Sequence, residues 1–147
     1  MPLNSLSSKG TELQKGDGAS PEDFSKIAGI TDMPAINATK STIEDTSLDD
    51  VNRHYVHGIG EPPSFTLTLN FDTDDTVQAE LITAYEEETN DNYRVVLPDS
   101  PATEYEFKAI VTGYSTPYGG INSLLQMDVT FQLNENDQGE IITKDPT

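Results

Sequence analysis

The chain has 147 residues, a length that predicts one domain built around one hydrophobic core. Its 26 acidic residues against 8 basic ones give a formal net charge of -18, and the cations are scattered singly, so we expect no basic surface for nucleic-acid phosphates. Without cysteine, disulfides and thiolate chemistry are excluded. We also expect no signal peptide and no membrane span, because the N-terminus lacks basic and apolar segments and no apolar run approaches spanning length.

The N-terminal third predicts short strands that follow a flexible arm. The arm comprises residues 1–8, and a single domain follows at 9–147. Residues 9–15 predict a weak edge strand, and residues 24–30 predict a short strand. A further extended, threonine-rich strand is expected at 36–43.

A long polar segment occupies residues 44–63. Its two prolines and two glycines argue against regular structure near its end. A structureless loop of this length is uncommon in a compact domain unless it is functional or disordered. Since Tyr55, Val56 and Ile59 are poor choices for a disordered linker, we expect a long extended loop that becomes ordered against a partner.

The clearest strand signal in the chain lies at residues 64–71. Apolar and polar side chains alternate there without a fault, with Phe65, Leu67, Leu69 and Phe71 on one face and Thr66, Thr68 and Asn70 on the other. This period of two predicts a strand with one buried face and one face that is wet or in an interface.

The next segment, residues 72–88, changes to helical spacing. The stripe expected to face the core consists of Val77, Leu81, Ala84 and Tyr85. We expect Asp72 or Thr73 to cap the helix and Asp74 and Asp75 to lie in its first turn, where the helix dipole favours negative charge.

The C-terminal half predicts further strands separated by turns. They are expected at 93–97, at 104–113, at 125–134 as the longest strand, and at 140–144 as a short strand pairing back through a hairpin. Strands joined by turns favour antiparallel pairing. The fold expected is therefore mainly β, an antiparallel sandwich or barrel flanked by one α-helix.

Each candidate for chemistry is weak. His54 and His57 lie in a loop flanked by glycine and proline, and no further histidine or cysteine completes a zinc site. Residues 72–75 and 134–139 could hold calcium, but a helix cap and a hairpin turn explain them without an ion. No nucleophile elbow, phosphate loop or dinucleotide motif is present. We therefore predict no enzyme, no metal and no cofactor.

Several modest motifs, taken in order, resemble the major tail protein, or tail tube protein, of long-tailed bacteriophages. The resemblance runs from about residue 9 to 144. It rests on KGTEL at 9–13, IAGI at 27–30, IEDTSLDD at 43–50, RHYV at 53–56 with Gly58, the strand and helix from 64 onward, LPD at 97–99, residues 107–113, VTF at 129–131 and GEI at 139–141. Some family members carry an additional immunoglobulin-like domain at the C-terminus, and we expect none here.

The resemblance implies a structural role in the virion tail. Family members join sheets side by side into hexameric rings, and the rings stack into a hollow tube that surrounds the tape-measure protein and later passes DNA. The implied partners are further copies of the chain, the tape-measure protein, and tail terminator and distal tail proteins. The protein would be made in the host cytoplasm.

The same resemblance implies two sets of site residues. The loop at 44–63 would reach a neighbouring ring, with contacts expected at Asp49, Asp50, Arg53, Tyr55 and Val56. The candidates for outward faces lining the lumen are Glu104, Glu106, Asp128 and Gln132. An acidic lumen would let DNA slide without binding.

The alternative is a monomeric, acidic β-sandwich module that binds calcium or carbohydrate. It explains the many carboxylates and turns. It explains less well the ordered-looking arm and the absence of tryptophan, since sugar-binding platforms usually need exposed aromatic rings.

Overall fold

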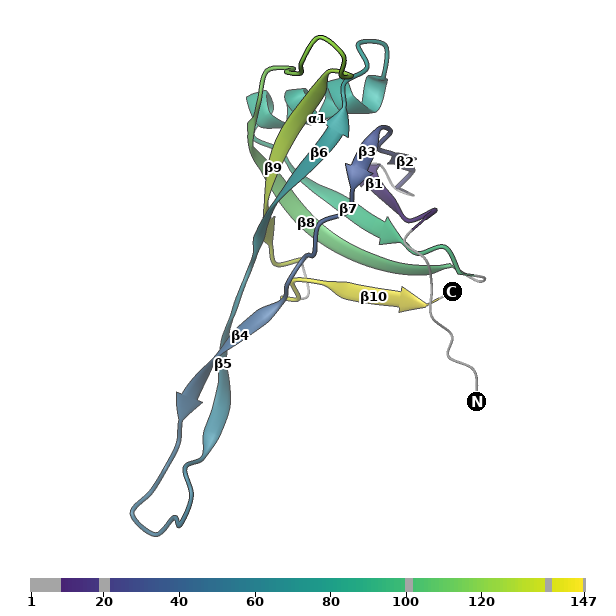
Figure 1. The fold of residues 1–147 in the computed structure, drawn as a ribbon. Helices are drawn as coiled ribbons and strands as arrows, with labels where there is room; N and C mark the ends of the chain where they lie inside the picture. The colour runs from purple at the N-terminus through teal and green to yellow at the C-terminus, as the bar shows by residue number, and fades with distance from the viewer. Residues whose placement is uncertain (1–8, 19–21, 100–101, 137–138, 147) are drawn as a thin grey trace, which may run out of the picture.

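The computed structural model describes residues 9–18, 22–99, 102–136 and 139–146 (Figure 1). The flexible arm expected at 1–8 lies outside them. The described part contains one helix and ten strands: β1 (Glu12–Gly16), β2 (Phe24–Lys26), β3 (Ile30–Asp32), β4 (Thr39–Glu44), β5 (Tyr55–Glu61), β6 (Ser64–Asn70), α1 (Thr76–Glu87), β7 (Asn90–Val96), β8 (Thr103–Tyr114), β9 (Gln126–Asn134) and β10 (Thr143–Pro146). The expected mainly β fold with one flanking helix is confirmed.

One curved antiparallel sheet forms the body. Its strand order is β2-β1-β7-β8-β9-β6-β3, and β10 pairs with β8 beside this path. The two terminal strands, β2 and β3, are consecutive in sequence, so the sheet curls until its ends come near each other (Figure 1). The twelve-residue β8 is the longest strand, rather than the nine-residue β9 expected to be so.

Alternation along the central strands builds the core. The buried side chains come mainly from β6, β8 and β9: Phe65, Leu67, Leu69, Phe107, Ala109, Val111, Met127, Val129, Phe131 and Leu133. Burying each Leu, Val or Phe stabilises the fold by about 1.5–3 kcal/mol relative to exposure. The Phe65 and Phe131 rings stack with centroids 4.9 Å apart, and Tyr93 meets Phe131 edge-on at 5.2 Å.

The hydroxyl of Tyr93 lies within this aromatic core. It is the buried side-chain polar atom that has no hydrogen-bond partner among the described residues. Burial, and secondarily the negative charge of Asp91, raise the pKa of Tyr93 far above its usual value. The tyrosine is therefore neutral at every physiological pH.

Helix α1 begins one residue after its cap, Asp75. The Asp75 carboxylate accepts hydrogen bonds from the backbone N–H groups of Val77 (2.9 Å) and Gln78 (3.2 Å). The expectation that Asp72 or Thr73 caps the helix, with Asp75 in the first turn, is wrong. Asp72 instead accepts from the Asp74 N–H (3.0 Å) and forms the turn that leads into the helix.

The buried face of α1 also differs from the expected stripe, of which Val77 is only half-buried. Leu81 and Ala84 are buried as expected, but Tyr85 is 41% exposed and packs edge-on against Tyr114. Gln78, which is not part of the expected stripe, is buried with 1% exposure. Its amide is fully used: Nε2 donates to the carbonyls of Ala28 and Asn70, and Oε1 accepts from the Asp72 N–H.

The predicted strand at 24–30 is two strands. Gly29 separates β2 from β3 with a φ of +82°, and a Cβ at this position would lie 2.7 Å from the Asn70 carbonyl oxygen. This close approach and left-handed backbone turn the chain from one end of the sheet to the other.

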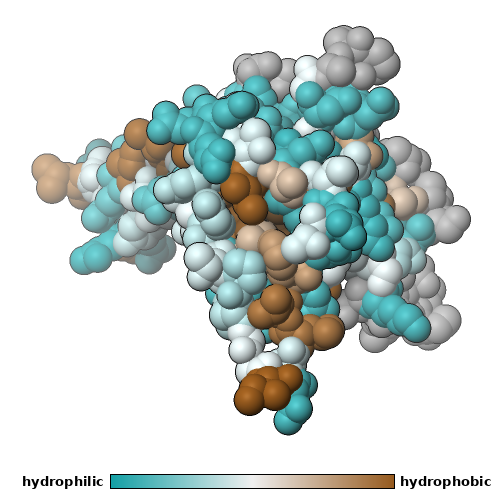
Figure 2. Space-filling view, turned by 90° about the horizontal axis from the view of Figure 1, so that it is seen from above, coloured by the Kyte–Doolittle hydropathy of each residue, from teal (hydrophilic) through white to brown (hydrophobic). Residues whose placement is uncertain are grey.

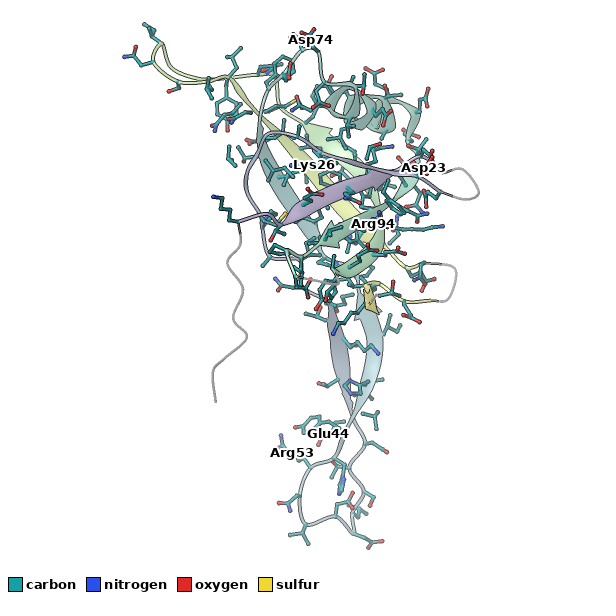
Figure 3. All side chains as sticks on the ribbon, turned by 90° about the vertical axis from the view of Figure 1, so that its right-hand side faces the viewer. Asp23, Lys26, Glu44, Arg53, Asp74 and Arg94 are labelled. Carbon is teal, nitrogen blue, oxygen red and sulfur yellow. The ribbon has the colours of Figure 1, made fainter. Side chains whose placement is uncertain are left out.

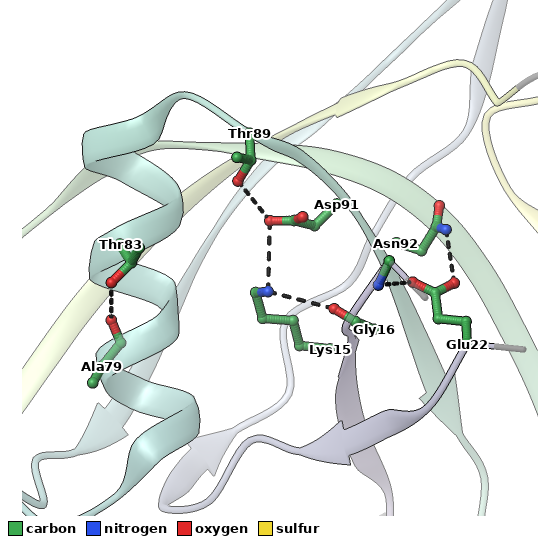
Figure 4. A network of polar contacts seen from close by, with 9 residues as sticks. Lys15, Gly16, Glu22, Ala79, Thr83, Thr89, Asp91 and Asn92 are labelled. Atoms are coloured by element: carbon green, nitrogen blue, oxygen red, sulfur yellow. Dashed lines mark hydrogen bonds and ion pairs between the residues drawn. The ribbon is translucent and has the colours of Figure 1, made fainter. Parts of the chain in front are cut away.

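The strand predicted at 9–15 is not an edge strand. β1 begins at Glu12 and lies between β2 and β7. Its Lys15 is buried, and the ammonium lies 3.6 Å from the Asp91 carboxylate, which also accepts from the Thr89 hydroxyl at 2.8 Å (Figure 4). This ion pair joins β1 to the start of β7 just beyond the end of α1.

The last strand also departs from its prediction. β10 covers Thr143–Pro146 rather than residues 140–144, and it pairs with β8 rather than folding back on β9. β9 and β10 thus share one edge of the long β8, with β10 opposite Thr103–Glu106 and β9 opposite the second half. No helix in the described part is long and apolar enough to span a membrane.

Candidate functional site

Strands β4 and β5 form a separate two-stranded hairpin that projects far from the body (Figure 1). Ile43 lies opposite Val56, and Glu44 lies opposite Tyr55. The expectation of a long loop without regular structure at 44–63 is wrong for residues 55–61, which are strand β5.

The two glycines of β5 stand where a Cβ would come close to neighbouring side chains. A Cβ at Gly58 would clash with the Ser41 hydroxyl, and a Cβ at Gly60 would lie 3.1 Å from Ile141 Cδ1. Glycine at these positions therefore allows β5 to approach β4 and the 139–142 segment closely. In the sequence alone, the same glycines argue against regular structure.

The tip of the hairpin, residues 45–54, is held by its own hydrogen bonds. The Asp50 carboxylate accepts from the Ser47 N–H (2.6 Å) and the Ser47 hydroxyl (3.2 Å). The His54 N–H donates to the Thr46 hydroxyl (3.0 Å), and the Asp45 N–H donates to the His54 carbonyl (2.7 Å). The tip is thus preorganised before it meets any partner.

Charged groups of the hairpin are only loosely paired. Arg53 lies 3.8 Å from Glu44, and both side chains are mostly exposed (Figure 3). His54 Nε2 lies 3.4 Å from Asp50 Oδ1. Exposed pairs of this kind exchange partners at little cost.

Several large apolar side chains of the hairpin are exposed. Leu48 is 105% exposed and Val51 is 96% exposed at the tip. Four others lie along the strands with about half or more of their surface in solvent, namely Ile43, Tyr55, Val56 and Ile59. An apolar surface of this extent on a projecting hairpin is typical of a protein–protein contact.

Of the expected interface residues, Arg53, Tyr55 and Val56 lie exposed on this hairpin, as does Asp49. Asp50 lies with them but is occupied as the turn-forming residue of the tip. The sequence reading missed Leu48 and Val51, although two isolated aliphatic residues within an acidic loop were a usable signal.

A second exposed apolar cluster lies at the other end of the molecule, on the loop between β8 and β9. It consists of Tyr118, Ile121, Leu124 and Leu125 on the loop, with Tyr85 and Tyr114 beside it. Figure 2 shows hydrophobic residues running out to the tip of a projection from the body. We name this set the upper cluster; the sequence reading took its loop for a simple turn.

The upper loop is anchored to the body by backbone bonds. Tyr118 and Gln126 exchange two hydrogen bonds of 2.9 and 2.8 Å, and the Phe71 N–H donates to the Leu125 carbonyl at 2.8 Å. The last bond ties the loop to the start of the acidic segment that leads into α1.

Glu104, Glu106, Asp128 and Gln132 all lie on the outward face of β8 and β9, opposite the buried residues of each strand. Glu104 pairs with Arg94 at 3.2 Å, and Asp128 accepts from the Thr68 hydroxyl at 2.8 Å. That this face lines a lumen stays a prediction.

The charges on this outward face nearly cancel. On β7, β8 and β9 it carries three acids, Glu104, Glu106 and Asp128, and two bases, Arg94 and Lys108, for a net charge of -1. The negative charge concentrates elsewhere, since residues 72–88 hold seven acids and no Lys or Arg.

No metal centre emerges from the described residues: within 9–18, 22–99, 102–136 and 139–146, no three His, Asp or Glu side chains are grouped to hold an ion.

An apolar groove of about 290 Å³ opens on the body, between β7, β8 and the segments at 33–36 and 142. Its lining includes Met33, Ile36, Val95 and Tyr105.

Comparison with known proteins identifies the family. A family model described as phage tail tube, TTP, lambda-like matches residues 4–106, which is more than half of the chain. A search of curated proteins finds no match.

Solved structures share the fold at low sequence identity. The chain aligns with one from an extracellular contractile injection system, PVC sheath/tube terminator in the extended state, at 12% identity, a TM-score of 0.74, and coverage of 99% of this chain and 100% of that one. It also aligns with a chain from the tail of an empty gene transfer agent particle (16% identity, TM-score 0.73, coverage 97% and 100%). A third match is the SPP1 tail tube (11% identity, TM-score 0.67, coverage 97% and 81%). The chain therefore belongs to the lambda-like phage tail tube family and is a structural protein of the virion tail.

Proposed function

We propose that six copies of this chain close into a ring and that the rings stack into the hollow tail tube through which DNA leaves the virion. The protein acts without enzymatic activity and is made in the host cytoplasm. Its partners are its own copies, the tape-measure protein, and terminator and distal tail proteins. The observation that carries this proposal is the preorganised β4–β5 hairpin, whose apolar side chains have no cover in the single chain.

Burial of that hairpin against another copy removes an unfavourable surface. Leu48 and Val51 are almost wholly exposed at its tip, and each gains about 1.5–3 kcal/mol when it is fully buried. Because the tip is already ordered by its own hydrogen bonds, little conformational entropy is lost on docking.

Open strand edges supply a second kind of contact. Within the described residues β10 pairs only with β8, and β4 and β5 pair only with each other. Their free edges present unpaired backbone groups that a neighbouring copy can pair with, which joins sheets within a ring.

The outward face of β6, β7, β8 and β9 suits the lumen. Threonine, asparagine and glutamine dominate it, and its charges nearly cancel. Such a surface stays hydrated, and its basic groups do not outnumber its acidic ones. It therefore does not hold phosphates, and DNA passes without being retained.

Negative-stain electron microscopy of the purified, concentrated protein tests the proposal. Hollow tubes or stacked rings are the expected result. If particles remain small and monomeric even with tail-tip and tape-measure proteins present, the proposal fails, and the acidic binding module becomes the better account.

A further inference from the structure

The apolar groove on the body lies where the core is open to solvent. Helix α1 lies at the end of the sheet where β7 begins (Figure 1), whereas the groove lies where β7 ends. Val95 and Leu97 line it from that end, with Tyr105 and Phe107 of β8 beside them. Apart from Phe107 these side chains are only half-buried, so the apolar core continues here to an uncovered surface.

We infer that residues 1–8 of the same chain bind in this groove and cover it, with Leu3 and Leu6 as the side chains that it takes. Residues 1–8 lie outside the described part of the chain, and each other stretch of the sequence outside that part is at most three residues long. The inference concerns the single chain, so it does not depend on the proposed tube.

The point at which this segment is attached supports the inference. Thr11, three positions after residue 8, is itself part of the groove wall. Gly10 has a φ of +94°, and a Cβ on it would lie 3.2 Å from Pro98 Cβ, so the backbone turns closely past the end of β7. Leu6 stands five positions before Thr11. An extended chain of that length reaches about 18 Å, which brings Leu6 within range of the groove.

Residues 1–8 also match the groove in chemistry. The segment contains no Asp, Glu, Lys or Arg, although 23% of the whole chain is charged. Half of it is apolar, namely Met1, Pro2, Leu3 and Leu6. A segment without charged side chains enters an apolar groove without leaving an ionised group unpaired.

Two other occupants fit the groove less well. The hairpin tip, residues 45–54, carries three aspartates and one arginine, so its docking would bring carboxylates against an apolar wall. Residues 1–8 of a second copy have the right chemistry but must bind from solution. The chain's own segment is tethered at the groove, where its effective concentration is on the order of millimolar.

A cover supplied by the chain itself has a consequence for the free subunit. An open apolar groove invites nonspecific association, and a bound N-terminal segment removes that surface before any copy meets another.

Thiol accessibility in dilute, unassembled protein tests the inference, because the natural chain has no cysteine. An Ile36→Cys variant places one thiol in the groove wall. Its rate of reaction with a maleimide is compared with and without the added changes Leu3→Ser and Leu6→Ser. With both leucines present the reaction should be about tenfold slower, the protection given by a segment that is bound about nine-tenths of the time. Equal rates would overturn the inference.

A thiol far from the groove is the matched control. Val51→Cys stands at the tip of the hairpin, where the natural side chain is 96% exposed, and its rate should not respond to the leucine changes. A response of the same size at both positions overturns the inference, because the protection is then not confined to the groove.

Dilution separates the chain's own segment from that of a second copy. Protection that persists on dilution supports the inference, and protection that disappears assigns the groove to a second copy and overturns it. If Ile36→Cys does not fold, Val95→Cys in the same groove repeats the measurement. Each of these results can be read whether or not the protein forms tubes, so a failure here leaves the proposed function to its own test.

Discussion

Gln132 on β9 donates through Nε2 to the carbonyl oxygen of Pro62, 3.0 Å away, and to that of Pro63 at 3.3 Å. The same side chain was expected to line the lumen. That stays a prediction, but these bonds join the outward sheet face to the root of the projecting hairpin, so the orientation of the hairpin depends on the sheet.

Replacing Gln132 by Ala removes these bonds. We expect a loss of about 1 kcal/mol in the free energy of unfolding, together with shorter or fewer tubes, because the hairpin root is less well held. Urea unfolding and electron microscopy measure the two effects. The control is Asn134→Ala on the same strand and face, whose side chain bonds to Asn90 instead. Equal tube lengths for the two variants would show that Gln132 does not position the hairpin.

Replacing Arg53 and Tyr55 together by Ala should impair tube formation and leave the monomer folded. Both side chains are mostly exposed in the single chain, so their loss changes its stability by less than about 0.5 kcal/mol. Circular dichroism and electron microscopy separate folding from assembly. Lys26→Ala serves as the control, since its pair with Glu12 is similarly exposed but lies on the body. Normal tubes from the Arg53 and Tyr55 variant would remove these residues from the interface.

Replacing Gln78 by Leu should destabilise the chain despite the greater hydrophobicity of leucine. The change leaves the Asp72 N–H without its partner and removes the donor to the Ala28 and Asn70 carbonyls; a polar group that the leucine covers and leaves unpaired costs about 1–3 kcal/mol. Urea unfolding measures it against Glu80→Leu, an exposed position of the same helix. A leucine that stabilises the protein would refute the role assigned to this amide.

Asp99 makes part of the stability dependent on pH. Hydrogen bonds from the Thr103 backbone N–H and then its hydroxyl, each 2.8 Å, lower the pKa of Asp99 below its usual value of 3.8. A carboxyl with a lowered folded-state pKa stabilises the fold above its unfolded pKa, and this contribution is lost as the pH falls through the folded pKa. Wild-type protein should therefore exceed Asp99→Asn in stability near pH 6, and the difference should shrink below pH 4. A difference that stays constant with pH would contradict this.

The alternation of apolar and polar side chains was enough to predict the main strands of the body and their buried faces. β6 and β9 each bury one face against the core, so their period of two is visible in the residues themselves. The pairing of β10 with β8 was not visible, because it depends on how the long β8 extends past β9 rather than on any local pattern.

Strand β4 (39–44) overlaps the strand predicted at 36–43, but its partner β5 escaped prediction for a different physical reason. All six residues of β4 are exposed, and no face of the β4–β5 ribbon packs on the body core, so selection for burial left no alternation to detect. Its exposed apolar surface could be predicted only in part: Tyr55 and Val56 stood out as apolar residues in a polar segment, whereas Leu48 and Val51 were not singled out.

β5 continues into β6 through Pro62 and Pro63, and β6 pairs with β9 along all seven of its residues, from Ser64 to Asn70. A pull on the hairpin tip is thus transmitted along the strand axis into β6, which lies between β9 and the terminal strand β3. The hydrogen bonds between β6 and β9 lie across that axis and resist in shear as a group, instead of opening one after another. In the proposed tube, the contact that joins one copy to the next is for this reason mechanically continuous with the β6–β9 pairing of each subunit, so tension along the tail is spread over the sheets.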